Sequence, residues 1–199
     1  LFAGSHALTF WLSRPQAKQA EHPAATSPLY LMDRAAVHIL DTAAFGRAVR
    51  QVARDLQVPP AWLMAVMYAE SGFDPAVANR QGSGAVGLIQ FMPATARELG
   101  TSSAALSRLT PHDQLGYVGR YLAQVQARYG PYQSLTDLYL AVLYPRARGQ
   151  DPCYALYARP SRAYRQNQGL DENGDGIVTV SDIDQRLARR FPEAYVLQI

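Results

Sequence analysis

Glu70 is the residue whose position in the sequence most suggests chemistry. It lies in the last turn of an apolar segment, Ala61 to Ser71, which reads AWLMAVMYAES. Burial among such side chains removes water from a carboxylate, and the negative end of a helix opposes its ionisation. Both effects raise the pKa, and an acid that keeps its proton near neutral pH can protonate the leaving oxygen of a glycosidic bond. A glutamate that points to solvent at a helix end explains this segment alone equally well.

A glycine-rich segment follows and favours the catalytic interpretation. It runs from Gly82 to Ala96, reads GSGAVGLIQFMPATA, and carries little side-chain bulk before Leu88. Such a backbone can approach a ligand closely and offer its own polar groups. Gln90 is polar within an apolar stretch, and its amide both donates and accepts, as sugar hydroxyls and acetamido groups require. The two segments together predict a carbohydrate site.

Three motifs in this region resemble a known family. ESGFDP begins at Glu70, GAVGLIQ begins at Gly84, and MPATA begins at Met92. In this order and spacing they resemble the signature of the soluble lytic transglycosylases, densely over residues 60–100 and more loosely to Tyr144. The resemblance implies a mainly α, goose-type lysozyme-like helical domain with a glycine-rich active-site loop.

The resemblance also implies roles for individual residues. Glu70 corresponds to the catalytic glutamate, Ser71 to the serine that orients it, and Gln90 to the glutamine that lines the cleft. The family's later motif, Ala-Tyr-Asn-Ala-Gly, has a tyrosine whose hydroxyl approaches the glutamate, and Tyr144 occupies that place. This chain departs from the motif at Pro145, where the family has asparagine. Tyr144 is the one aromatic residue assigned to the substrate, from the candidates Tyr117, Tyr121, Tyr139 and Tyr144.

By resemblance, Glu70 protonates the oxygen between N-acetylmuramic acid (MurNAc) and N-acetylglucosamine (GlcNAc). It then takes the proton of the muramic C6 hydroxyl, which gives a 1,6-anhydro product without a catalytic cofactor. The other nearby carboxylates have simpler interpretations: Asp74 in a turn, and Asp113 and Asp137 as helix caps. Two alternatives remain open, a muramidase that uses water on the same fold and a non-catalytic wall-binding module. The intact pair of Glu70 and Ser71 speaks against the second.

Residues 171–182 resemble a calcium loop of the EF-hand and dockerin type. Side-chain oxygens stand at positions one, three, five and twelve, a glycine at six, and a backbone carbonyl is available at seven. The expected ligands of a structural Ca²⁺ are Asp171, Asn173, Asp175, Ile177 and Asp182. A helix is expected over 181–190, and no good helix before Asp171. A plain Asp/Gly turn is the alternative.

Helical spacing dominates the elements that position these residues. Asp41 caps a predicted helix through Gln57 that has an apolar face, and prolines open further helices. The predicted helices after Pro60 run over Pro93 to Leu99, Pro111 to Tyr129, and Ser134 to Leu143. No alternating apolar run is long enough for a substantial sheet. The fold class is therefore mainly α.

Composition and domain organisation set the remaining expectations. The chain has 199 residues and one cysteine. Its 19 Lys plus Arg exceed its 16 Asp plus Glu too little to indicate a nucleic-acid binder. The four histidines are scattered and have no spacing typical of metal ligands. We expect an arm and linker over 1–32, the lysozyme-like domain over 33–165, and a C-terminal segment over 166–199 packed on it. Leu1 to Leu12 is apolar but too short to span a membrane. We expect a monomer that acts on peptidoglycan in the periplasm or cell envelope. A phage virion, or a membrane anchor or larger assembly upstream of residue 1, stays open.

Overall fold

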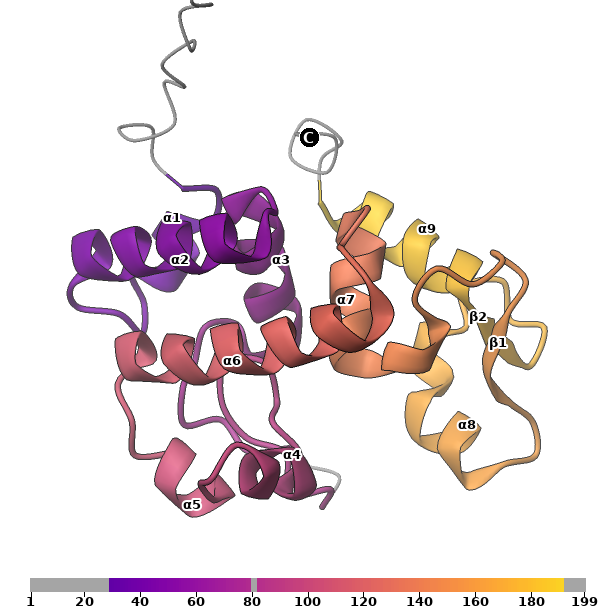
Figure 1. The fold of residues 1–199 in the computed structure, drawn as a ribbon. Coiled ribbons are helices and arrows are strands. Elements are labelled where there is room, and N and C mark those ends of the chain that lie inside the picture. Colours follow the sequence, from indigo (N-terminus) through magenta and orange to yellow (C-terminus); the bar gives the residue numbers. More distant parts are fainter. Residues whose placement is uncertain (1–28, 80–81, 192–199) are drawn as a thin grey trace, which may run out of the picture.

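The computed structural model describes residues 29–79 and 82–191, and this part of the chain is mainly helical (Figure 1). The longer helices are α2 (Thr42–Leu56), α3 (Pro60–Ser71), α6 (Pro111–Tyr129), α7 (Leu135–Leu143) and α9 (Val180–Arg190). The short ones are α1 (Met32–Ala35), α4 (Pro93–Glu98), α5 (Ser103–Leu106), α8 (Arg162–Asn167), η2 (Pro145–Ala147) and η3 (Gln168–Leu170). The predicted mainly α fold class is confirmed.

The helices α2 and α3 form as the sequence predicts. Asp41 caps α2 by accepting a hydrogen bond from the Ala44 amide at 2.8 Å, and the face carrying Phe45, Val49 and Leu56 is buried. The α3 helix begins at a proline in its first position and buries seven consecutive residues, 61–67. Because α3 is apolar on all sides, it lies in the centre of the core.

The helices α6 and α7 start where the sequence predicts, but their capping residues differ from the prediction. The caps are the hydroxyls of Thr110 and Ser134, which accept from the amides of Asp113 and Asp137 at 3.1 and 3.0 Å. The prediction that the two aspartates are the caps was therefore wrong, because each lies three residues inside the helix. Asp137 instead pairs at 3.0 Å with Arg148, which is 6% exposed. This buried ion pair joins the start of α7 to the segment after η2.

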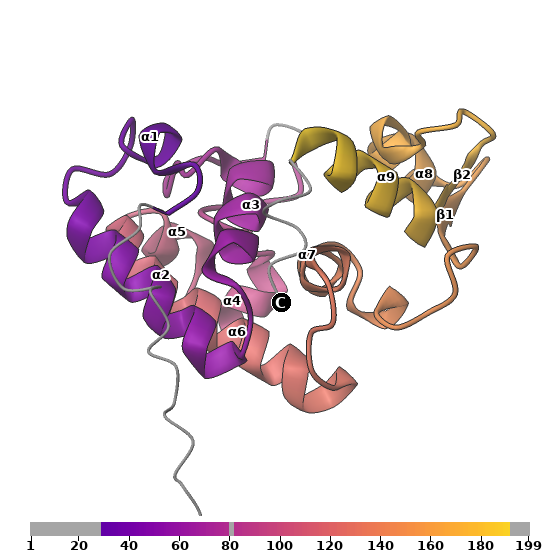
Figure 2. The same ribbon diagram turned by 90° about the horizontal axis from the view of Figure 1, so that it is seen from above.

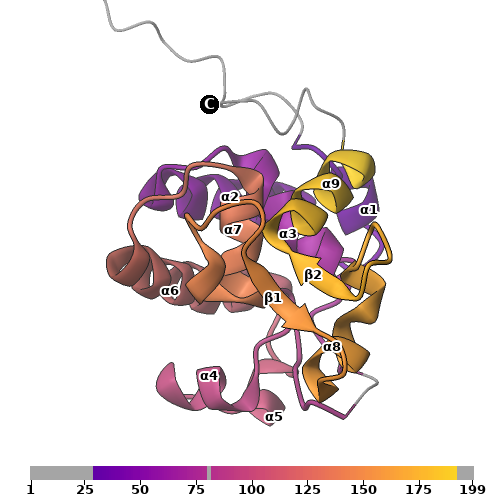
Figure 3. The ribbon, with the colours of Figure 1, turned by 90° about the vertical axis from the view of Figure 1, so that its right-hand side faces the viewer.

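The C-terminal part of the described chain is a small unit packed on α7 (Figures 1 and 2). Strands β1 (Ala155–Ala158) and β2 (Ile177–Thr179) form an antiparallel pair, and α8 and α9 flank it (Figure 3). α9 buries Ile183 and Leu187. The sheet is as small as predicted. The expectation that no helix precedes Asp171 was wrong, because α8 and η3 lie there.

The described end of the predicted arm packs on the core. Leu29 is buried, and the Tyr30 ring meets the Phe191 ring edge-on with centroids 6.4 Å apart. The predicted linker therefore ends before these two residues. The apolar segment Leu1 to Leu12 lies outside the described residues. Within residues 29–79 and 82–191, no helix has the length and apolar character needed to cross a membrane.

Candidate active site

Glu70 lies in the last turn of α3 and is half-buried. Burial raises the pKa of its carboxyl from the ordinary 4.5 to about 7. A hydrogen bond with the Tyr139 hydroxyl and the positive charge of Arg190 act in the opposite direction and lower this pKa. Loss of hydration therefore outweighs both stabilising neighbours, and the group can hold or release a proton near neutral pH.

The chain reverses sharply directly after Glu70. Gly72 and Phe73 both have positive φ, 62° and 71°, a conformation that is unfavourable for a residue with a side chain. Phe73 is held there by complete burial between the rings of Phe45 and Tyr68, with centroids 6.5 and 5.7 Å away. This packing fixes the direction in which α3 ends, and with it the position of Glu70.

Ser71 ties the end of α3 to the glycine-rich loop. Its hydroxyl lies 3.0 Å from the carbonyl oxygens of both Met67 and Leu88, and it accepts from the Phe73 amide at 3.2 Å. Within the described residues, none of these bonds goes to the Glu70 carboxyl. These hydrogen bonds join the C-terminal turn of α3, which carries Glu70, to the glycine-rich loop, and the orienting role of Ser71 stays a prediction.

Gln114 holds the glycine-rich loop in place and was missed by the sequence reasoning. Its buried side chain accepts from the Leu88 amide at 2.9 Å and donates to the carbonyls of Pro75 and Leu106 at 2.6 and 2.8 Å. The loop passes it at Gly87, where a Cβ atom would lie 2.5 Å from the Gln114 Oε1. The available signal was a polar residue four positions before Val118, on the apolar face of the predicted helix.

Gln90 lies in the same loop but uses part of its amide internally. Its Nε2 donates to the carbonyl oxygens of Val77 and Gly87, both at 3.2 Å, and its backbone has a positive φ of 52°. We expected this amide both to donate to a sugar and to accept from one. Because its NH₂ group is engaged within the protein, only the accepting role stays a prediction. The side-chain oxygen is the atom left to meet a ligand donor.

The hydroxyl that reaches Glu70 belongs to Tyr139 on α7, where the family resemblance had placed that of Tyr144. Tyr139 is 7% exposed, and burial together with the neighbouring Glu70 raises the pKa of its hydroxyl far above the ordinary value. Tyr144 caps the C-terminus of α7, and its ring meets that of Tyr157 on β1 edge-on at 5.7 Å. Burial, Tyr144 and Glu70 raise the pKa of Tyr157 to about 12, so this pair lies within electrostatic range of the carboxyl. Because Pro145 begins η2 directly after Tyr144, the chain turns away from α7 there.

The groups that perturb the Glu70 carboxyl include no second carboxylate within the part of the chain that the structure describes. Among the described residues, the groups that shift the pKa of Glu70 are Tyr139 and Arg190, and neither is acidic. Asp74, the nearest aspartate in sequence, accepts from the Ala76 amide at 2.8 Å and so forms the predicted turn. Within the described residues, the groups that this pKa brings together are therefore one carboxyl, one phenol and one guanidinium.

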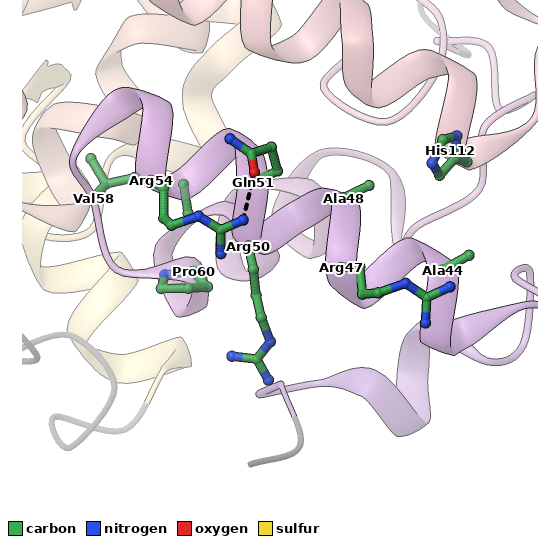
Figure 4. Close-up of a pocket in the computed structure, with 10 residues that line it drawn as sticks. Ala44, Arg47, Ala48, Arg50, Gln51, Arg54, Val58, Pro60 and His112 are labelled. Carbon is green, nitrogen blue, oxygen red and sulfur yellow. Dashed lines mark hydrogen bonds between the residues drawn. The ribbon is translucent and has the colours of Figure 1, made fainter. Parts of the chain in front are cut away.

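A separate groove of about 870 Å³ runs along α2, and Figure 4 shows the residues that line it. Its charged lining consists of Arg47, Arg50 and Arg54, together with His112 at the start of α6. Neither Glu70 nor another carboxyl is among the described residues of this lining. Among the described residues, the lining of this groove therefore offers no carboxyl that could donate a proton to a glycosidic oxygen.

The predicted calcium loop is held by its own hydrogen bonds. Asp171 accepts from the amides of Gly174 and Gly176 at 2.8 and 2.9 Å and from the Tyr164 hydroxyl at 2.7 Å. The Tyr164 hydrogen bond is the main reason why the pKa of Asp171 is lowered. The Asn173 side-chain oxygen accepts a hydrogen bond from the Asp175 amide at 3.0 Å. The first positions of the loop thus fold as an Asx-type turn.

The later expected ligands are also engaged. Asp175 accepts from the Ile177 amide at 2.8 Å, and buried Asp182 accepts from the amides of Thr179 and Glu172 at 2.8 and 3.0 Å. In residues 29–79 and 82–191, no three His, Cys, Asp or Glu side chains gather as a metal-ion site. Calcium binding stays a prediction from the sequence.

A comparison with known protein families found a match that includes the helix that carries Glu70. Residues 47–143 match a family model described as the transglycosylase SLT domain. The match covers α2 from Arg47 onward, all of α3 with Glu70, the glycine-rich loop, α6 and α7. The strands and α9 lie beyond it. Residues 47–143 are therefore similar to the transglycosylase SLT domain, and this similarity supports a peptidoglycan-cleaving function of the lytic-transglycosylase type in general.

Proposed function

We propose that the protein is a lytic transglycosylase that cleaves the β-1,4 bond between MurNAc and GlcNAc and leaves a 1,6-anhydromuramyl end. Glu70 is its acid and then its base. The observation that carries this proposal is a carboxyl whose pKa is raised to about 7, with no other carboxylate of residues 29–79 and 82–191 among the groups that perturb it.

In the first step Glu70 is the acid. A pKa of about 7 leaves roughly half of these carboxyls protonated at pH 7, whereas an ordinary glutamic acid is almost fully ionised there. The proton moves to the glycosidic oxygen, the bond from that oxygen to the muramic C1 breaks, and the GlcNAc unit leaves with a free hydroxyl. Positive charge develops at C1.

In the second step the Glu70 carboxylate is the base. The Tyr139 hydroxyl and the Arg190 charge stabilise this carboxylate, which accepts the proton of the muramic C6 hydroxyl. The C6 oxygen bonds to C1, Glu70 regains its proton, and no water is consumed. A two-carboxylate hydrolase would need a second acid roughly 5 to 9.5 Å from the first, and the surroundings of Glu70 argue against one.

The walls around Glu70 suit a glycan strand in the bacterial cell wall. The glycine-rich loop, which Ser71 ties to the end of α3, offers backbone groups and the Gln90 side-chain oxygen. The ring pair of Tyr144 and Tyr157, within electrostatic range of Glu70, offers aromatic surface, and such faces pack well against sugar rings.

Digestion of purified sacculi tests the proposal. Glu70→Gln should abolish release of soluble fragments while wall binding persists, because the amide cannot donate and recover this proton. Glu98→Gln removes an exposed carboxyl on α4 and serves as the matched control, with activity like that of wild type. Wild-type turnover by Glu70→Gln would refute the assignment, and products ending in reducing muramic acid would indicate a muramidase instead.

A further inference from the structure

Arg190, the last residue of α9, lies against the C-terminal turn of α3. Its Nη2 donates to the Tyr68 carbonyl at 3.4 Å, and its guanidinium faces the Tyr68 and Phe191 rings at 5.1 and 5.6 Å from their centroids. Tyr68 precedes Glu70 by only two residues. Three contacts thus hold the guanidinium at the end of the helix that carries the acid.

The helix that supplies Arg190 is itself well anchored. Thr179 and Asp182 form a capping box at its start, and Ile183 and Leu187 are buried as it packs on α7. Figures 2 and 3 show α9 running beside the end of α3. Because α9 lies outside residues 47–143, this charge comes from a part of the chain that the family model does not cover.

We propose that Arg190 is a positioning residue for Glu70: it fixes the last turn of α3 and presents its positive charge to the carboxylate that forms when the proton leaves. This inference rests on the proposed role of Glu70 as the acid. A cation held beside the site favours the carboxylate over the protonated acid. Removing the charge should therefore slow proton donation and should leave substrate binding largely unchanged.

The groups around Glu70 keep their charge near pH 7, so the titration of the Glu70 carboxyl can be measured without interference from them. They are the Tyr139 hydroxyl from α7, Tyr157 from β1, and Arg190 from α9, while Arg186 on α9 acts on Tyr139. Burial raises the pKa of Tyr157 to about 12 and that of Tyr139 further still, and arginine stays protonated throughout. Within this described set, Glu70 is the group that changes charge near pH 7.

Two variants and a matched control test the proposal. Arg190→Gln removes the charge and the ring contacts, whereas Arg190→Lys keeps the charge and loses the planar guanidinium. Arg189→Gln removes the same charge from the neighbouring residue, whose side chain is 69% exposed and pairs with Glu172 at 2.6 Å. Carbon-13 NMR would follow the Glu70 carboxyl against pH, assigned by its loss in Glu70→Gln. Initial rates on soluble glycan strands would give kcat and KM.

We expect the Glu70 carboxyl to titrate at higher pH in Arg190→Gln than in wild type, with a lower kcat, a similar KM, and an alkaline limb of the rate profile moved to higher pH. Arg189→Gln should match wild type. In Arg190→Lys the titration should return toward the wild-type position while kcat stays reduced.

An unchanged Glu70 titration in folded Arg190→Gln would overturn the proposal, and so would a rise in KM alone. If Arg190→Gln does not fold, Arg190→Lys decides, because a wild-type kcat would show that the planar contact with Tyr68 is not needed. A wild-type protein that fails to cleave glycan would refute the proposed function separately, since the NMR comparison needs no activity.

Discussion

Replacing Glu70 by glutamine should stabilise the protein above neutral pH. The pKa of this carboxyl is about 7 in the folded chain and near 4.5 when it is exposed to water. A raised pKa means that folding favours the protonated acid, so its contribution to stability is complete below about pH 4.5 and is lost as the pH rises to about 7. At 1.36 kcal/mol per pH unit, the full loss is about 3 kcal/mol.

Glutamine never ionises, so Glu70→Gln escapes this loss. The gain in the free energy of unfolding should be near zero at pH 4, should grow through pH 5 to 7, and should level off at about 3 kcal/mol by pH 8. Urea unfolding at a series of pH values measures it directly. Glu98→Gln on α4 controls for the loss of one acidic charge, since that side chain is exposed. Parallel stability curves for Glu70→Gln and wild type would refute the claim that Glu70 is desolvated.

Three further changes test other parts of the site. Tyr139→Phe removes a hydrogen bond to the carboxylate, which is worth about 1.5–3 kcal/mol, so turnover should fall roughly 10- to 100-fold with folding preserved; an unchanged rate on glycan strands would place its hydroxyl outside the chemistry. Gly87→Ala puts a methyl group 2.5 Å from the Gln114 oxygen, so it should lower the free energy of unfolding by about 1–3 kcal/mol and remove much of the activity. Gly100→Ala, with open space around it, should keep its activity. If the calcium loop binds its ion, an excess of one hundred times Kd adds about 2.7 kcal/mol, and Asp175→Ala should abolish that rise in Tm; calorimetry without a calcium signal at millimolar concentration would return the loop to a plain turn.

The sequence predicted the helices well because their signals are local. Asp41 as a cap, Pro60, Pro93 and Pro111 in first turns, and the apolar stripe of α2 are each properties of a few neighbouring residues. The burial of Glu70 also followed from its own segment, since α3 is apolar on every side.

The contacts between helices could not be predicted in the same way. Glu70 bonds to Tyr139 because α7 packs on α3, and it feels the charge of Arg190 because that side chain reaches Tyr68 at the end of α3. The spacing of residues within one helix does not reveal which hydroxyl lies beside Glu70. Tyr144 was chosen by analogy with the family's motif, while Tyr139 lies in a helix so apolar that its tyrosine resembles ordinary core. Gln114 was missed for the same reason, because its partners Pro75 and Leu88 are far away in the sequence and Leu106 lies in a separate helix.

The most direct test of the single-carboxylate mechanism is digestion of purified peptidoglycan in water enriched in oxygen-18, followed by mass spectrometry of the muramic ends. Attack by the C6 hydroxyl consumes no water, so the wild-type protein should release 1,6-anhydromuramyl ends that carry no oxygen-18, and Glu70→Gln should release none. Reducing muramic ends that are one water heavier and labelled with oxygen-18 would contradict the account, because they would show that water, and not the substrate's own hydroxyl, completes the reaction beside Glu70.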